Sequence, residues 1–318
     1  METLKLFFLR HFEKLIVLSI LLIVVYITYF IPYKIGFLNF FYLPIIIAGY
    51  YLGKRMAVLT AILCILSIVL FVFLSPESFF KSETEKLYTV VSFLAWCSFL
   101  ILTSAALGHL YEEKEKRIKD LKTAYIGVLE ILSKYLESAD RYTKGHSVRV
   151  AYLAEDIAKA MQLSANEVET IKAAALLHDI GKTEISMDIV NKAAKLTESE
   201  RKIIDLHPEK GAALLGPVSG VLKEAVPIVL AHHTYYFDSN KFSSEDGQAF
   251  PVGACIIAVA DAYDAIVTDR PYRAGQPPWK AFEEIEKESG SRFHPEVIKA
   301  FKTVLMHDER YRLEKPEI

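Results

Sequence analysis

The sequence has few cysteines, almost no net charge and no strand-like pattern in its C-terminal part. Cys64, Cys97 and Cys255 are widely separated in the 318-residue chain, which argues against a disulfide framework or a cysteine zinc site. The formal net charge is only −2, so nothing indicates binding to a nucleic-acid polymer. Beyond about residue 125, no segment alternates apolar and polar residues as a half-buried strand would. The chain is therefore predicted to be all-α.

Apolar residues are abundant, and their excess is concentrated in the first third of the chain. Hydrophobic residues make up 52% of the sequence, and the mean hydropathy is +0.25, which is high for an ordinary soluble protein. Four runs approach the ~20 residues needed to cross a bilayer, with no charge in their middle. They extend roughly from Leu15 to Pro32, Gly36 to Leu52, Met56 to Leu74 and Leu87 to Leu110. Residues 1–110 are therefore predicted to form a four-span membrane and sensor module in the lipid bilayer.

Basic residues predict how these runs are oriented. Lys5, Arg10 and Lys14 precede the first run, and Lys54 and Arg55 separate the second from the third. More lysine and arginine residues follow the fourth run. Because such residues favour the cytoplasmic side, both termini are expected in the cytoplasm. The stretch FYLPIIIAGYYLGKR resembles the compact membrane input modules of bacterial sensor kinases. This resemblance implies a multi-pass protein of the bacterial cytoplasmic (inner) membrane.

A helix is predicted to leave the membrane over residues 111–127. Ile118, Leu121, Tyr125 and Val128 recur at three- and four-residue steps, which is the spacing of a short coiled coil. A homodimer formed through this helix, transmitting a signal from the membrane, is the favoured interpretation. The alternative is a solvated helix that packs on its own domain.

Residues 128–318 are predicted to form a helical domain that is large enough for its own core. Two helix starts are well marked, by Ser164 with Glu167 and by Thr197 with Glu200. Each pair has the spacing of a capping box, in which two side chains satisfy the first free backbone groups of a helix. The first of these helices is expected to end at LLHDIGK, residues 176–182, where Gly181 would let it stop.

Metal-type ligands stand where the apolar stripes of five predicted helices begin or end. They are His146, His178 with Asp179, His207, His232 with His233, and Asp261. One such histidine would normally be a hydrogen-bonded core residue, but buried imidazoles and carboxylates from five helices all need partners. A shared metal centre satisfies them together. Five histidines and two aspartates without cysteine favour two divalent ions, iron or manganese, rather than structural zinc. Asp179 is the expected bridge.

These residues lie in segments that resemble a known family. The ordered segments TKGHSVRVA, LLHDIGK, HPEKG, AHH and VADAYDAIVTDRPYR are similar to those of the HD-GYP group of the HD phosphohydrolase superfamily, over about residues 124–302. The resemblance implies a helical domain with two or three metal ions that hydrolyses cyclic di-GMP to pGpG or GMP. By position it implies metal ligation by His146, His178, Asp179, His207, His232, His233 and Asp261. It also implies a phosphate contact for Lys182, a phosphate or guanine contact for Arg270 and Arg273, and a place beside the ligands or the substrate for Asp264.

The chain departs from the family pattern at two places. The segment HHTYYFDSNKFSSEDGQAFP lacks the Gly-Tyr-Pro that follows the paired histidine in the family. In the family, that loop lines the substrate groove and meets partner domains, so the change implies an altered substrate choice or altered partner binding. Members with three metals carry a glutamate four residues before the first histidine. Tyr142 stands there in this chain, which favours two ions.

The sequence therefore predicts a membrane-anchored hydrolase. Its expected activity is that of a metal-dependent phosphodiesterase, in which a metal-bound hydroxide attacks the phosphorus of a cyclic dinucleotide, most simply cyclic di-GMP. Asp179 and Lys182 are the expected catalytic residues. Two alternatives stay open. One is an HD phosphohydrolase that acts on another nucleotide, and the other is a non-catalytic membrane receptor that binds a nucleotide or a partner.

Overall fold

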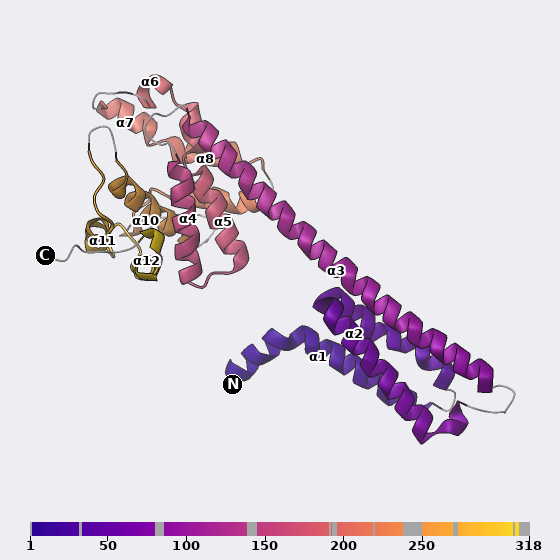
Figure 1. Ribbon diagram of the computed structural model, residues 1–318. Coiled ribbons are helices and arrows are strands. Elements are labelled where there is room, and N and C mark those ends of the chain that lie inside the picture. Colours follow the sequence, from indigo (N-terminus) through magenta and orange to yellow (C-terminus); the bar gives the residue numbers. More distant parts are fainter. Residues whose placement is uncertain are drawn as a thin grey trace. The chain divides into compact units, whose positions relative to one another are not determined.

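The computed structural model is helical throughout the residues that it describes. These are 2–31, 34–79, 86–138, 145–190, 192, 196–218, 220–237, 250–269, 273–307 and 309–311. Within them no strand occurs, and the pairing of Ser289 with Phe293 is an isolated bridge. The predicted all-α class is confirmed (Figure 1). The chain divides into two compact units, residues 1–123 and 124–318.

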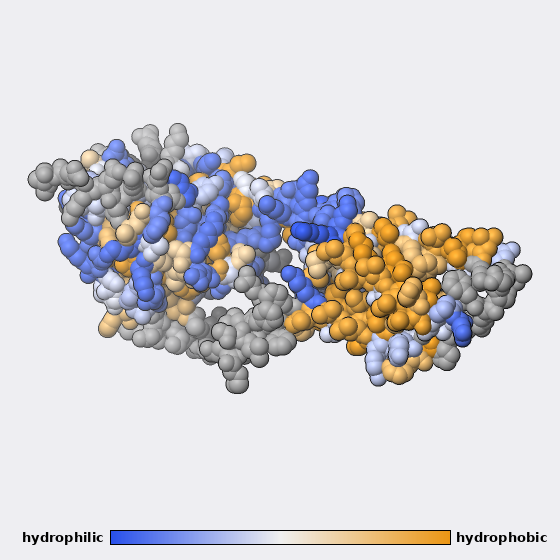
Figure 2. Space-filling view, turned by 60° about the horizontal axis from the view of Figure 1, so that its bottom comes forward, coloured by the Kyte–Doolittle hydropathy of each residue, from blue (hydrophilic) through white to orange (hydrophobic). Residues whose placement is uncertain are grey.

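The first unit is built from long apolar helices. Its elements are α1 (Glu2–Phe30), the 3-10 helix η1 (Lys34–Phe41), α2 (Tyr42–Leu74), the 3-10 helix η2 (Pro76–Ser78) and the first part of α3 (Lys86–Glu137). Three stretches are long and apolar enough to cross a membrane: Phe12–Phe30, Gly36–Leu74 and Leu87–Glu137. Large apolar side chains are exposed over this unit, where Figure 2 shows them gathered on the surface. An apolar surface of this extent is typical of contact with lipid rather than water.

The described residues contain three such helices, where the sequence predicted four runs. The second and third predicted runs are two arms of α2, which is interrupted at Gly53 by a backbone φ of 79°. A Cβ atom placed on Gly49 would lie 3.7 Å from the Cβ of Ala57. Residues eight apart in a straight helix are separated by about 12 Å, so the two arms fold back on each other. Glycine makes the reversal possible because it adopts positive φ without steric cost.

The second unit contains the end of α3 and a set of shorter helices. They are α4 (His146–Ala160), α5 (Ala165–Leu177), η4 (Ile180–Glu184), α6 (Met187–Val190), α7 (Glu198–Ile204), α8 (His207–Leu215), α9 (Val221–Ala231), α10 (Val252–Val267), α11 (Pro278–Lys287), α12 (Pro295–His307) and η6 (Glu309–Tyr311). Helix α4 packs against α5, α10 and α12, and α5 packs against α9. Fully buried Leu153, Ile157, Leu176, Ile257 and Phe301 lie in the core that these helices share.

Capping boxes mark the starts of two helices of the second unit, and the first of these helices leads to candidate ligands. Both predicted capping boxes are confirmed, with Ser164 and Glu167 at the start of α5 and Thr197 and Glu200 at the start of α7. Helix α5 ends at Leu177, so the polar pair that follows stands directly beyond the buried face of the helix.

Candidate metal centre

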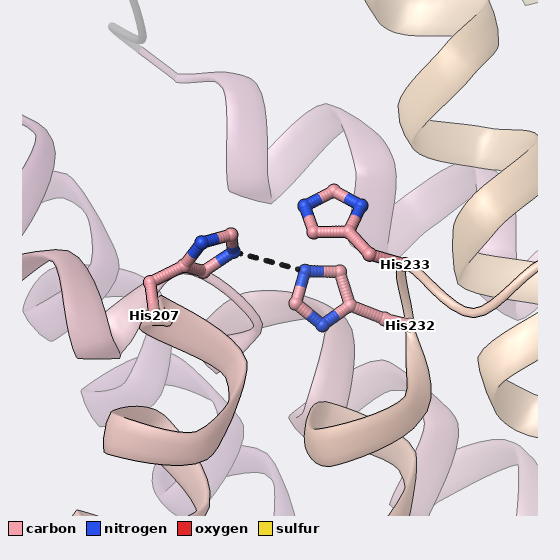
Figure 3. A group of neighbouring side chains, drawn as sticks. All are labelled: His207, His232 and His233. Carbon is pink, nitrogen blue, oxygen red and sulfur yellow. Dashed lines mark hydrogen bonds between the residues drawn. The ribbon is translucent and has the colours of Figure 1, made fainter. Parts of the chain in front are cut away.

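The predicted ligands come from the ends of four helices and the middle of a fifth, all in the second unit. His146 is the first residue of α4, His207 is the first residue of α8, and Asp261 lies within α10. His178 and Asp179 follow α5, and His232 and His233 follow α9. Six of them form two groups of possible ligands, His207 with His232 and His233, and His146 with His178 and Asp179. Asp261 is in neither group, but its Oδ1 lies 3.2 Å from Nε2 of His146. Within each group the ligand atoms lie within 4.8 Å of one another, and Figure 3 shows the rings of the first group turned toward a common point.

Three histidines are oriented by their own helices. In each, the Nδ1 atom lies within hydrogen-bond distance of the carbonyl oxygen three residues earlier. The pairs are His178 with Ala175 at 2.8 Å, His207 with Ile204 at 2.8 Å and His232 with Val229 at 2.6 Å. A carbonyl oxygen can only accept, so Nδ1 carries the proton in every case. When the ring is neutral, Nε2 therefore presents a lone pair, as a metal-ligating imidazole must.

The neutral rings of His207 and His232 present their Nε2 lone pairs to each other, an arrangement that a cation would stabilise. Burial lowers the pKa of His207 to about 4, and burial together with neighbouring His233 holds the pKa of His232 well below its usual range. The Nε2 atoms of His207 and His232 are 3.3 Å apart (Figure 3). With Nδ1 protonated on both rings, two lone pairs face each other and neither can donate. A metal ion between them removes this conflict, and nitrogen and carboxylate donors without sulfur suit a divalent transition metal.

Asp179 belongs to the second group and also reaches the first. Its Oδ1 is 3.3 Å from Nε2 of His207, and its Oδ2 is 3.5 Å from Nε2 of His178. Burial would raise the pKa of this carboxyl, but the Lys182 ammonium and the surrounding histidines outweigh it and hold the pKa well below its usual range. The Nζ of Lys182 donates to Oδ2 at 2.6 Å. The carboxylate is therefore ionised and reaches ligands of both groups, which is the geometry of a bridge.

His146 is held by two carboxylates on α10. Its Nε2 is 3.2 Å from Oδ1 of Asp261, and its Nδ1 is 2.7 Å from Oδ2 of Asp264. Burial alone would lower the pKa of this ring, but the bonds to Asp261 and Asp264 raise it to about 10. Asp264 thus lies beside a candidate ligand, one of the positions expected from the resemblance. In a metal-bound site it would accept the Nδ1 proton and fix the tautomer of His146.

Arg149 belongs to the site and was missed by the sequence analysis. Its Nε donates to Oδ1 of Asp264 at 2.6 Å, and a second guanidinium nitrogen donates to Oδ2 at 3.0 Å. This fork holds the carboxylate that orients His146. The signal available in the sequence was its position three residues after His146, since residues three apart share a helix face.

The predicted arginine contacts are not part of this cluster as described. Arg273 is exposed, and its guanidinium donates to the carbonyl oxygens of Ala265 and Ile266 in α10 at 3.0 and 3.3 Å. Arg270, Tyr142 and residues 238–249 of the segment that lacks Gly-Tyr-Pro lie outside the described residues.

A pocket of about 330 Å³ opens beside the bridge. Asp179 and Lys182 line it together with residues of η4, α6 and the end of α3, among them Leu136, Thr183 and Met187. A phosphate that entered this pocket would meet the Lys182 ammonium next to the candidate metal ligands.

A family model for the HD domain matches residues 130–297, which is more than half of the chain and includes every predicted ligand. The chain belongs to the HD-domain family. The family predicted from the HD motif and its companion segments is thereby confirmed. HD-domain proteins depend on metal ions, in agreement with the two groups of possible ligands.

Several curated relatives share this HD domain. The chain is 37% identical over 209 residues to a protein of Thermotoga maritima named cyclic di-GMP phosphodiesterase, covering 64% of this chain and 57% of that protein. It is 36% identical over 177 residues to cyclic di-GMP phosphodiesterase PA4108 of Pseudomonas aeruginosa, covering 52% and 40%. It is 32% identical over 186 residues to 3'3'-cGAMP-specific phosphodiesterase 3 of Vibrio cholerae, covering 58% and 40%. The chain thus spans about half the length of these relatives.

Proposed function

We propose that this protein is a membrane-anchored, metal-dependent phosphodiesterase that hydrolyses a cyclic dinucleotide, with cyclic di-GMP as the first candidate substrate. The observation that carries the proposal is the ionised Asp179 carboxylate, which reaches candidate ligands in both groups while its other partner, Lys182, lines a pocket. The names of HD-domain relatives support the substrate class.

The proposed centre holds two divalent ions, iron or manganese. The ligands are His146, His178, Asp179, His207, His232, His233 and Asp261. When bound, such ions polarise a phosphoryl oxygen and acidify water. The remaining roles belong to the chain's own residues. Lys182 balances the negative charge of the phosphate in the pocket, Asp264 and Arg149 keep His146 in one orientation, and the helix carbonyls do the same for His178, His207 and His232. In the net reaction, an oxygen of water bonds to phosphorus, one ester P–O bond breaks, and the departing oxygen gains a proton.

A second candidate substrate is 3'3'-cGAMP. It is favoured by the name of a relative from Vibrio cholerae, 3'3'-cGAMP-specific phosphodiesterase 3, and by the absence of Gly-Tyr-Pro after His233, in a segment that the family uses to line the groove. A substrate contact by Arg273 is part of the same proposal, and it requires the guanidinium to exchange its bonds to Ala265 and Ile266 for bonds to phosphate or guanine.

We further propose that the protein is a homodimer through α3, with the first unit in the lipid bilayer of the bacterial inner membrane and both termini in the cytoplasm. Leu121, Val128 and Tyr135 follow one another at seven-residue steps and are 72%, 61% and 74% exposed. An apolar seam of that period on a polar helix is what two parallel helices bury against each other.

Turnover and metal content of the full chain in detergent test the enzymatic proposal. Purified protein is loaded with Mn²⁺, its metal content is measured, and products from cyclic di-GMP and from 3'3'-cGAMP are separated. We expect hydrolysis of at least one substrate. Asp179→Ala should reduce it by more than about a hundredfold, because even residues that only orient a ligand are worth 10–100-fold. Asp120→Ala, on an exposed part of α3, should leave it unchanged. A metal-loaded chain that leaves both dinucleotides intact would overturn the proposal in favour of a receptor or another nucleotide.

A further inference from the structure

The last residue of helix α3 contacts the first turn of α4. The Glu137 side chain is buried, with the residue only 7% exposed. One carboxylate oxygen accepts the backbone N–H of Gly145 at 2.5 Å, and the other accepts the backbone N–H of Ser147 at 2.6 Å. These two backbone groups flank His146. A single side chain from α3 therefore holds the chain on both sides of a candidate metal ligand.

This contact replaces a cap that α4 does not supply itself. The first N–H groups of a helix have no partner within it, and the residue before α4 is Gly145, which has no side chain to offer and a positive φ of 73°. The Glu137 carboxylate satisfies the N–H of Ser147 in the first turn, and its negative charge lies at the positive end of the helix dipole. The position of α4 relative to the site thus depends on a residue eight positions before Gly145.

His146 has little freedom to compensate for a shift of its backbone. Its two ring nitrogens lie 3.2 Å from Asp261 and 2.7 Å from Asp264, and both carboxylates are on α10. Its candidate ligand partners, His178 and Asp179, directly follow the C-terminal end of α5. The ring must meet all of them from one backbone position, which Glu137 holds.

The same end of α3 also forms part of the pocket wall. Ser133, Leu136 and Glu137 line the pocket that contains Asp179 and Lys182. We propose that Glu137 is a positioning residue for His146, through which the end of α3 regulates how tightly the site holds the metal ion that His146 binds. The inference rests on the metal centre of the proposed function.

Metal binding by the full chain in detergent tests this role without any substrate. Mn²⁺ titration followed by electron paramagnetic resonance measures the affinities, and His146→Ala and His233→Ala identify which affinity belongs to which ligand group. Glu137→Gln keeps the shape of the side chain, but its amide nitrogen cannot accept an N–H. We expect about a tenfold loss in the affinity that His146→Ala weakens, the scale seen when a residue that orients a ligand is altered. The affinity that His233→Ala weakens should not change.

Glu130→Gln is the matched control. Glu130 lies on the same helix seven residues earlier and also bonds to α4, accepting the hydroxyl of Tyr152 at 3.0 Å. That bond holds Tyr152 rather than the residues that flank His146. Glu130→Gln should bind Mn²⁺ as the unchanged chain does.

Three results would overturn the inference. The first is an unchanged affinity at the His146 group in Glu137→Gln. The second is an equal loss at both groups together with a lower melting temperature of the metal-free variant, since that pattern reports a general loss of stability. The third is a chain that binds no Mn²⁺, which would remove the metal centre as well. If Mn²⁺ binds as expected but neither dinucleotide is hydrolysed, the proposed function fails while the role of Glu137 stands.

Discussion

The surrounding protein shifts the pKa values of the site's histidines in opposite directions. His207 and His232 are buried with Nδ1 bonded to a carbonyl, and burial lowers the pKa of both. His146 is also buried, but its two carboxylate partners raise its pKa to about 10. In the metal-free protein, neutral acceptors thus lie beside one charged ring. His207 and His232 would present their lone pairs to a bound divalent ion, and His146 would have to give up its ring proton to ligate one.

This contrast predicts a stability maximum near pH 6.5 for the metal-free chain. Burial lowers the pKa of His207 from its ordinary value of 6.5 to about 4 in the fold, so the unfolded state takes up a proton first and stability falls as pH drops from 6.5 to 4. For His146, the raised pKa stabilises the fold fully below 6.5, and this contribution is lost as pH rises toward about 10. The pKa values of Asp179, Asp261 and Asp264 are lowered in the fold. The stability that these carboxylates contribute is lost only below pH 3.8.

Melting temperatures in detergent with a chelator, measured from pH 4 to pH 9, check this expectation. His207→Gln should make the acid side of the profile shallower, because it removes one of the buried rings that cannot take up a proton. His307→Gln, at an exposed position on α12, is the control and should leave the profile unchanged. An acid side that keeps its full slope in His207→Gln would contradict the assignment.

The residues of the site were predictable from sequence to different degrees. His146, His178, His207 and Asp261 continue apolar stripes of helical period, and that local pattern was enough to propose them as ligands. The role of Arg149 depends on Asp264, which is 115 positions away. Its position three residues after His146 could place it on the same helix face, but no local pattern identifies Asp264 as its partner. The direction of the Arg273 guanidinium is likewise a matter of tertiary contact.

At the scale of elements, the site depends on a close approach between η4 and the start of α8. A Cβ atom placed on Gly181 would lie 2.0 Å from the carbonyl oxygen of His207 and 2.5 Å from the backbone nitrogen of Gly211. The sequence predicts that Gly181 lets a helix end. Helix α5 has already ended at Leu177, and the glycine instead permits two backbones to pack together. That approach brings Asp179 within 3.3 Å of His207.

Gly181→Ala should therefore separate the two ligand groups. The added methyl group meets backbone atoms that cannot turn aside, so η4 and α8 must move apart, and overpacking of this kind costs about 1–3 kcal/mol. We expect a lower melting temperature and weaker Mn²⁺ binding, measured on the full chain. Gly216→Ala is the matched control, because a Cβ there would have ordinary contacts of 3.4 and 3.5 Å. Unchanged Mn²⁺ affinity in Gly181→Ala would show that the bridge does not depend on this contact.

The break in α2 separates what hydropathy could predict about this helix from what it could not. Hydropathy predicted two apolar runs on either side of Lys54 and Arg55, and both runs exist as arms of α2. Their connection depends on the backbone of Gly53, for which hydropathy carries no signal. The glycine in YYLGKR was visible, but its positive φ was not.

At the scale of the whole molecule, the two units have opposite surfaces. The first unit exposes large apolar side chains along three helices that could cross a membrane. The second unit encloses a core of its own, contributed by the end of α3 and by helices α4, α5 and α8 to α12, and hydrophilic residues predominate on its surface in Figure 2. Since the HD-domain match begins at residue 130, all of the candidate chemistry belongs to the second unit.

This division predicts that a fragment from Tyr111 to Ile318 is soluble and keeps the activity of the full chain. The full chain should stay with membranes after washing with high salt and with alkaline carbonate, because three apolar helices rather than surface charges hold it there. The fragment should remain in the supernatant, bind Mn²⁺ and turn over the same dinucleotide.

The Tyr111 fragment should also sediment as a dimer. A fragment that starts at Ala124 lacks Leu121, so its dimer should be weaker and should dissociate at a higher protein concentration. Release of the full chain by salt alone would contradict anchoring by the helices, and a monomeric Tyr111 fragment would contradict dimerisation through α3.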